Sequence, residues 1–288
     1  MPFTKMHGLG NDYVYLDAFE SPALAERGDL PALAQAMSDR RFGVGSDGLI
    51  LVAPPTAPGA DARMVMFNAD GSVGAMCGNG LRCVVRLVVE RRHAAAVGGG
   101  VTIETASGLR RARVVDRAGD WLISADMAQP RLDLGSIPAR RDVLEPAGRR
   151  GGLDLWRVGG VVGGLVSMGN PHLVSFADRL PEPAELDRIG PGIERHPAFP
   201  DGINVHVARA LSRDRAEMVT WERGSGRTLA CGTGACAVLV AGALAGLLDR
   251  SAIVTLPGGD LRIEWPEAGG GVVMTGPATE VYRGVWPG

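Results

Sequence analysis

Two cysteines occupy matching positions in the two halves of this 288-residue chain. Cys77 begins the segment CGNG and Cys231 begins the segment CGTG, and a run of apolar residues at helical spacing follows each. A helix N-terminus offers unpaired N–H groups and a partial positive charge, which favour a thiolate and bind a carboxylate. The glycines remove the Cβ atoms that would keep an anion away from these amides. Such segments could hold the carboxylate of an amino acid beside a thiol.

A pair of thiols facing one carbon could invert its stereochemistry. Inversion by proton transfer needs a base on one face and an acid on the other, because a single base tends to return the proton to the face it came from. A thiol with a pKa of about 8.5 is only a few per cent ionised at pH 7. A helix dipole supplies about 2 kcal/mol at most, which lowers that pKa by little more than about one unit. A further partner is therefore needed, and His172 and Glu222 are candidate neighbours.

Other interpretations of the cysteines stay open on this pattern alone. A cysteine among small residues is commonly a buried structural residue, and Cys83 and Cys236 inside the helices are interpreted in that way. The spacings C-x5-C and C-x4-C differ from the C-x2-C pairs typical of zinc sites, so we expect no metal. The glycine loops lack the GxxxxGK[ST] pattern and the context of a dinucleotide fingerprint.

The composition is that of a globular protein that acts on small molecules. Hydrophobic residues make up 45% and charged residues 22% of the chain, and the formal net charge is -2. This balance excludes wholesale disorder and leaves no excess positive charge for a nucleic acid or an anionic membrane. The longest uncharged apolar stretch, Ala235 to Leu248, is shorter than the about 20 residues of a membrane-spanning helix. The chain starts without an apolar leader, so we expect a cytoplasmic protein with reduced thiols.

The segments that carry the cysteines repeat in outline. In each half, strand-rich segments lead into the cysteine loop and then into a helix. Arg82, Arg86 and Glu90 form a polar stripe on the first helix, whereas the second has no polar face and must be enclosed. The alternation in INVHVA places Asn204 and His206 together on one face of a strand. These patterns predict an α+β fold of two similar domains, each a curled, mostly antiparallel sheet around a central buried helix.

A Pro-, Arg- and Gly-rich stretch, 129–152, has little to bury, and we expect the domain boundary near its start.

At these residues the chain closely resembles the diaminopimelate epimerase family of cofactor-independent amino acid epimerases. The resemblance runs from residue 5 to about residue 278 and is carried in order by KMHGLGNDY, FNADGS, MCGNGLRC, MGNPH, INVHV, WERGSGRTLACGTGACA and TGPA. It implies no cofactor, commonly a homodimer, and two pseudo-symmetric domains with diaminopimelate bound between them. It also implies that the C-terminal residues return to the first domain, which gives domains of 1–128 plus 277–288 and of 129–276.

The resemblance further implies a role for individual residues. Cys231 would take the proton from L,L-diaminopimelate and Cys77 would deliver one to the opposite face, with His172 and Glu222 near the reacting centre. It places the following residues in contact with substrate, some at its reacting end and some at its distal end: Asn11, Asn68, Gly78, Asn79, Asn170, Asn204, Glu222, Arg223, Gly232 and Thr233. Some members carry Gln where this chain has Gly48, so no side-chain contact is assigned there.

Two alternative functions remain beside this one. Another racemase or epimerase of the proline racemase kind would keep both cysteines but would not need an anchor for a distal carboxylate. Arg223 offers such an anchor, a planar fork that binds carboxylates with two hydrogen bonds, and so favours diaminopimelate. A non-catalytic thiol protein, redox-sensing or metal-binding, would have no use for two matching carboxylate-binding loops.

Overall fold

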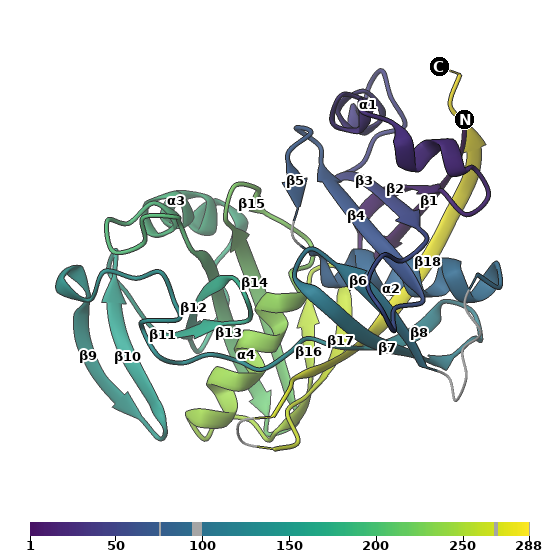
Figure 1. Cartoon of the computed structure of the whole chain (residues 1–288). Coiled ribbons are helices and arrows are strands. Elements are labelled where there is room, and N and C mark those ends of the chain that lie inside the picture. The colour runs from purple at the N-terminus through teal and green to yellow at the C-terminus, as the bar shows by residue number, and fades with distance from the viewer. Residues whose placement is uncertain (75, 94–99, 268–269, 288) are drawn as a thin grey trace. The chain divides into compact units, whose positions relative to one another are not determined.

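The chain divides into two compact units, of which the first is built from two separate segments of the sequence. The computed structural model describes residues 1–74, 76–93, 100–267 and 270–287 (Figure 1). Unit 1 comprises Met1–Asp126 and Thr275–Gly288, and unit 2 comprises Met127–Met274. Among the described residues, no helix combines the length and the hydropathy that crossing a membrane requires.

The elements of unit 1 lead from a hairpin through two helices to a three-stranded meander. They are β1 (Pro2–Gly8), β2 (Asn11–Asp17), the 3-10 helix η1 (Pro22–Glu26), α1 (Leu30–Ser38), β3 (Gly48–Ala53), β4 (Ala62–Asn68), β5 (Val73–Gly74), α2 (Gly78–Glu90), β6 (Gly100–Thr105), β7 (Gly108–Asp116) and β8 (Trp121–Asp126).

The elements of unit 2 are followed by a long strand that ends the chain. They are the 3-10 helix η3 (Arg141–Val143), β9 (Glu145–Arg150), β10 (Leu153–Val158), β11 (Val161–Ser167), β12 (Pro171–Phe176), α3 (Pro183–Glu194), β13 (Asn204–Ser212), β14 (Arg215–Glu222), β15 (Gly226–Arg227), α4 (Gly232–Leu244), β16 (Ser251–Leu256), β17 (Gly259–Glu264) and β18 (Val273–Val285), which starts in unit 2 and continues in unit 1.

The strands of unit 1 close into a ring around α2. Hydrogen-bonded neighbours follow one another in the order β18, β1, β2, β3, β4, β6, β7, β8 and back to β18. Two of these pairs, β2 with β3 and β4 with β6, are parallel, because α1 and α2 carry the chain back across the sheet between their strands. Helix α2 contacts β1, β2, β4, β6, β7 and β8. The helix is therefore enclosed by the strands.

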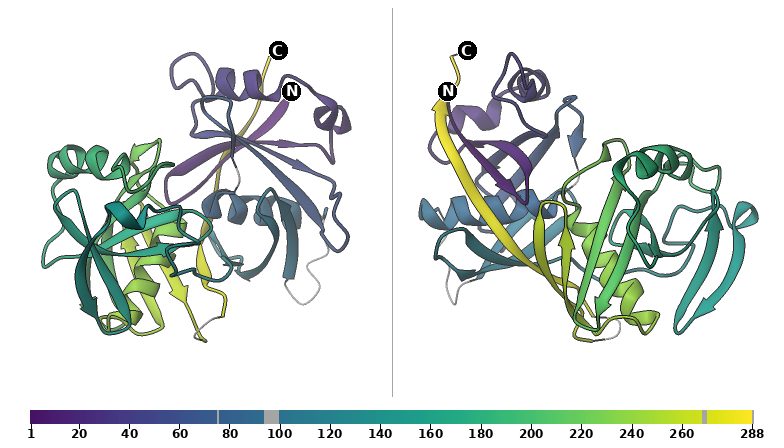
Figure 2. Two further views of the ribbon diagram at one scale, coloured as in Figure 1. Left: turned by 60° about the vertical axis from the view of Figure 1, so that its left-hand side comes forward. Right: turned by 180° about the vertical axis from the view of Figure 1, so that it is seen from behind.

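Unit 2 repeats this plan around α4. The neighbours run from β9 through β10, β11, β12, β13 and β14 to β16 and β17, and the parallel pairs are β12 with β13 and β14 with β16. Helix α4 lies among β11, β12, β13, β16 and β17, as further views show (Figure 2). The order β1, β2, α1, β3, β4, β5, α2, β6, β7 of unit 1 thus recurs in unit 2 as β11, β12, α3, β13, β14, β15, α4, β16, β17. The predicted fold class is confirmed.

The structure corrects one expectation about burial and shows what the polar stripe of α2 contacts. The polar stripe of α2 does not face solvent: Arg82 is fully buried, its Nε donates to the carbonyl oxygen of Pro277 at 3.0 Å, and Arg86 donates to Ala278 at 2.7 Å. The stripe therefore holds the returning C-terminal strand, whose carbonyl groups need donors. The stretch 129–152, expected to have little to bury, contributes to the core, since Ile137 and Leu144 are buried within unit 2.

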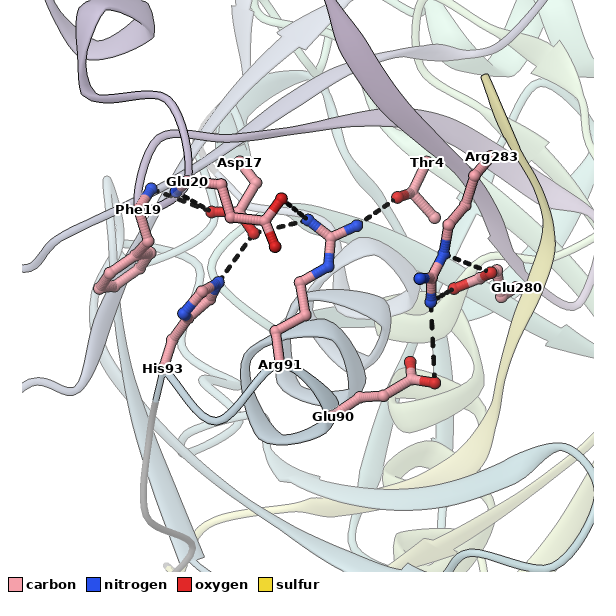
Figure 3. Close-up of polar contacts among 9 residues, drawn as sticks. All are labelled: Thr4, Asp17, Phe19, Glu20, Glu90, Arg91, His93, Glu280 and Arg283. Atoms are coloured by element: carbon pink, nitrogen blue, oxygen red, sulfur yellow. Dashed lines mark hydrogen bonds and ion pairs between the residues drawn. The ribbon is translucent and has the colours of Figure 1, made fainter. Parts of the chain in front are cut away.

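A cluster of ion pairs joins the C-terminal end of α2 to β1 and β2 (Figure 3). Arg91 lies 2.7 Å from Asp17, and it also donates to the hydroxyl of Thr4 at 2.7 Å. The side chain of Asp17 is only 7% exposed, so this ion pair offsets the cost of burying its carboxylate. At the edge of the same cluster, Arg283 pairs with Glu280 at 2.8 Å but is 54% exposed.

We expect Arg91→Met to lower the free energy of unfolding by about 3 kcal/mol, because it leaves the Asp17 carboxylate buried without its cation. Arg283→Met is the matched control and should cost less than about 1 kcal/mol, since water already screens that pair. Urea titrations followed by circular dichroism measure both values. Equal losses in the two variants would contradict the claim that the buried ion pair contributes more to stability than the exposed one.

Candidate functional site

Cys77 is the N-cap residue of α2. Its backbone is extended, and its sulfur accepts a hydrogen bond from the N–H of Gly80 at 3.4 Å. The thiol is partly exposed and donates to the side-chain carbonyl of Asn11 at 3.1 Å. Unit 1 thus presents a protonated thiol at a helix N-terminus, beside the backbone amides of Gly78 and Asn79.

Asn11 is fixed in the orientation that accepts this thiol hydrogen. Its amide nitrogen donates to Asp47 at 2.7 Å, so that its carbonyl oxygen turns toward Cys77 and also accepts from Asn79 at 3.3 Å. The side chain of Asn79 is held in turn by Arg82 at 2.9 Å. The structure therefore brings Asn11, Cys77, Gly78 and Asn79 together, as the resemblance implies.

The sequence analysis missed three residues of this network: Tyr13, Asp47 and Arg82. Burial, and then the neighbouring Cys77, raise the pKa of Tyr13 well above its usual value, so its hydroxyl stays protonated beside the thiol. Tyr13 follows the GLGND turn, and Asp47 ends the loop before β3. The sequence contains no signal for their proximity to Cys77, because the contact depends on how β2, β3 and α2 are packed.

Cys231 is the N-cap residue of α4 and is only 3% exposed. Burial raises the pKa of its thiol well above the usual range, and the neighbouring Glu222 carboxylate raises it further. The hydroxyl of Thr233, 3.7 Å from the sulfur, and the N–H of Gly234 act in the opposite direction. Glu222 is therefore a neighbour of the thiol, but its negative charge disfavours the thiolate, so it is not the partner that lowers the pKa of Cys231.

His172 reaches Cys231 through intermediates. Its Nε2 lies 2.9 Å from the carbonyl oxygen of Asn170, whose amide nitrogen donates to Thr233 at 3.3 Å. Its Nδ1 lies 2.8 Å from Nε2 of His206. Burial, then His206 and Arg223, lower the pKa of His172 well below its usual value, and burial lowers that of His206 to about 3. Both imidazoles are neutral at physiological pH.

His206 was not among the candidate site residues. The sequence signal was its place beside Asn204 on the polar face of INVHVA, and the structure places His206 of this face against Gly234 at the start of α4. A Cβ atom at Gly234 would lie 2.3 Å from Cε1 of His206, so only glycine allows this approach. The first turn of α4 is therefore placed against His206 at Gly234.

The remaining candidates differ in how they are used. Asn204 is buried: its carbonyl oxygen accepts from the backbone N–H of Arg223 at 3.0 Å and its amide donates to Pro171 at 2.9 Å. Arg223 is exposed and donates to the carbonyl oxygen of Asp201 at 2.9 Å. Asn68 donates to Ser72 at 2.9 Å within its own turn.

Position 48 has no room for a side chain, which explains the glycine found there. It begins β3 opposite Asn68, and a Cβ atom there would lie 2.1 Å from the carbonyl oxygen of Phe67 and 3.1 Å from the ring of Tyr13. A side chain such as Gln at this position would require a different course of the backbone.

One group of side chains has the donor types of a metal site. Asp17, Glu20 and His93 lie close enough to share an ion (Figure 3). Arg91 already pairs with both carboxylates, at 2.7 Å from Asp17 and 3.2 Å from Glu20. A divalent cation would have to displace this guanidinium, so the group is an ion-pair cluster rather than a metal centre.

Comparison with known proteins identifies relatives over the whole chain. The family model described as diaminopimelate epimerase matches residues 3–132 and 164–281. The chain is 45% identical to the diaminopimelate epimerase of Pelotomaculum thermopropionicum, covering 100% of this chain and 99% of the relative. It is 46% identical to that of Desulforudis audaxviator, covering 99% of both chains.

Solved structures share the fold at much lower identity. A hydroxyproline epimerase from Agrobacterium vitis superimposes with a TM-score of 0.64 at 16% identity, covering 99% of this chain and 91% of that one. A phenazine biosynthesis protein from Bacillus anthracis superimposes with a TM-score of 0.65 at 16% identity, covering 98% and 97%. These likenesses show the fold alone.

We expect Cys77 to be alkylated first when the folded protein reacts with iodoacetamide at pH 8. It is partly exposed, whereas Cys231 is buried with a raised pKa and therefore has little thiolate. Cys83 is buried and its pKa is raised to about 11, so it should stay unmodified. Peptide mass spectrometry over time gives the order. Urea-unfolded protein, in which all four cysteines react, is the control, and labelling of Cys83 before Cys77 would contradict the prediction.

Proposed function

Because the chain belongs to the diaminopimelate epimerase family, we propose that it interconverts L,L- and meso-diaminopimelate by inverting one α-carbon. The relatives that support this are 45% and 46% identical over nearly their whole length. The structural observation that carries the proposal is a duplicated one. Each unit encloses one helix whose N-cap is a cysteine and whose first turn contains two glycines.

The proposed reaction transfers two protons and needs no cofactor. The Cys231 thiolate removes the α-proton of the L,L-isomer, and the Cys77 thiol donates a proton to the opposite face of the same carbon. Afterwards Cys231 is a thiol and Cys77 a thiolate, which is the state that starts the reverse reaction. The hydrogen bond from the Cys77 thiol to Asn11 supports this division, since it requires Cys77 to be protonated.

The helix N-termini supply the electrostatic part of the mechanism. Removal of an α-proton pushes negative charge onto the α-carboxylate, and backbone N–H groups at the first turns of α2 and α4 stabilise that charge. The substrate's ammonium group brings a positive charge near the buried Cys231, which offsets the effects of burial and of Glu222 on its pKa. His172 and Asn170 orient Thr233 beside the same sulfur.

The distal end of the substrate distinguishes diaminopimelate from smaller amino acids. We assign the distal carboxylate to Arg223 and the distal ammonium to carbonyl oxygens from the group Asn68, Asn170 and Asn204, whereas Asn11 and Glu222, which contact the two thiols, belong to the reacting end. Arg223 is exposed and its backbone is fixed by Asn204. A racemase of the proline kind has no use for such an anchor, and the structures of that kind are only 16% or less identical to this chain.

The setting in which we place the enzyme follows from the same family. We propose a cytoplasmic homodimer that serves the synthesis of lysine and of peptidoglycan precursors. Apolar side chains exposed on β18, Val281 at 53% and Val285 at 73%, support association with a second copy.

We expect the reduced protein, without added pyridoxal phosphate or metal, to convert L,L- into meso-diaminopimelate and to incorporate one solvent deuterium at the inverted carbon. Cys77→Ala or Cys231→Ala should lower kcat about 10³-fold, the usual contribution of an acid or a base. Cys236→Ala, in the same helix as Cys231 but at a fully buried position, should keep its activity. Chiral chromatography and mass spectrometry measure both quantities. Full activity in either N-cap variant would refute the mechanism.

We expect Arg223→Met to reduce kcat/KM for diaminopimelate about 10- to 100-fold, because a hydrogen-bonded charge is lost from the binding site. Arg227→Met is the matched control: this exposed arginine pairs with Asp187 at 2.9 Å, and its loss should leave kcat/KM unchanged. Steady-state kinetics of the two variants decide the point. An unchanged kcat/KM in Arg223→Met would remove Arg223 from the substrate site.

A further inference from the structure

Three polar side chains of unit 2 connect the buried His206 to Cys231. His206 Nε2 is 2.8 Å from His172 Nδ1, and His172 Nε2 is 2.9 Å from the carbonyl oxygen of Asn170. The Asn170 amide is 3.3 Å from the Thr233 hydroxyl, which is 3.7 Å from the Cys231 sulfur. Every contact joins groups within one unit.

The hydrogens along this series must all point in one direction. A neutral imidazole has one N–H and one lone pair, so when His172 donates through Nε2 it accepts through Nδ1. The Asn170 side chain then accepts at its carbonyl and donates from its amide to Thr233, and the Thr233 hydroxyl hydrogen is free to point at sulfur. In the reverse direction, His172 would donate to His206, Asn170 would be flipped, and Thr233 would donate to Asn170 instead.

The surroundings of His206 favour the first direction. His206 is fully buried, and its Nδ1 has no hydrogen-bond partner among the described residues. In the first direction Nδ1 carries only a lone pair, whereas in the reverse direction it carries a buried N–H without an acceptor. An unpaired buried N–H is the rarer and more costly of the two. His206 therefore decides which tautomer its neighbour adopts.

We propose that His206 is a positioning residue that sets the direction of hydrogen bonding through His172, Asn170 and Thr233, so that the Thr233 hydroxyl donates to the sulfur of Cys231. The effect on catalysis rests on the proposed function, in which Cys231 must become a thiolate. A donor aimed at sulfur stabilises the thiolate, and it works against the burial and the Glu222 charge that raise the pKa of Cys231. The proton arrangement itself does not depend on the substrate.

The proton arrangement is tested first, on the unmodified protein. Long-range ¹H–¹⁵N correlation spectra of protein labelled at its 5 histidines distinguish the two neutral tautomers from the imidazolium. We expect His172 and His206 to be neutral and protonated at Nε2 from pH 6 to pH 8, with signals assigned from His172→Gln and His206→Gln. A His172 protonated at Nδ1 would overturn the proposal.

The catalytic consequence is tested with variants at position 206. His206→Leu removes the donor, and we expect kcat/KM at pH 7 to fall about tenfold, the effect of about one hydrogen bond to a charged group. The ascending limb of the pH profile should move to higher pH, so that the loss shrinks as the pH rises. His206→Gln keeps an N–H near the position of Nε2 and should restore most of the activity.

Thr220→Val is the matched control. Thr220 lies opposite His206 in the pairing of β13 with β14, and its buried hydroxyl also has no partner among the described residues. It takes no part in the series, so its loss should leave the rate and the pH profile unchanged. An equal loss in Thr220→Val, or a His206→Leu variant with an unshifted profile, would contradict the proposal. A native protein that does not epimerise diaminopimelate would refute the proposed function instead, while the tautomers would still decide the proton arrangement.

Discussion

The burial of one helix inside each sheet is the constraint on which the rest of this structure depends. A helix surrounded by strands satisfies its own backbone except in its first and last turns, where N–H and C=O groups need other partners. In both units the first turn begins with a cysteine and contains two glycines, so its amides stay accessible to an anion. Enclosing the helix therefore leaves the N–H groups of its first turn as the polar groups that the proposed chemistry uses.

The two helix starts are equivalent in topology but not in their surroundings. Cys77 is partly exposed and donates its thiol hydrogen to Asn11, which Asp47 holds in place. Cys231 is buried, adjacent to the carboxylate of Glu222, and its sulfur is approached by the hydroxyl of Thr233. One sulfur is therefore placed as a proton donor, and the other as a group that depends on its neighbours to ionise.

Several features could be predicted because they are local. A cysteine followed by Gly-x-Gly and a helical apolar run defines a helix start wherever that helix lies, and the lack of any polar face on α4 required its enclosure. Features that depend on a partner distant in sequence could not be predicted. Arg82 was expected on a polar face, but it is buried because β18, which returns about two hundred residues later, offers carbonyl oxygens to its guanidinium. The periodicity of a helix shows which residues share a face, not what that face meets.

The sequence by itself determined the class of the molecule: two copies of one α+β plan, each with a helix that begins at a cysteine. Spacing and side-chain type suffice for this, since helix capping and amphipathicity act over a few residues. Only the tertiary structure decided the burial and the hydrogen-bond partners of each thiol. Burial of Cys231, the approach of His206 to Gly234, and the link from His172 through Asn170 to Thr233 each join residues from different strands and a helix. Desolvation and hydrogen-bond direction depend on all neighbours in space, and those neighbours are set by packing.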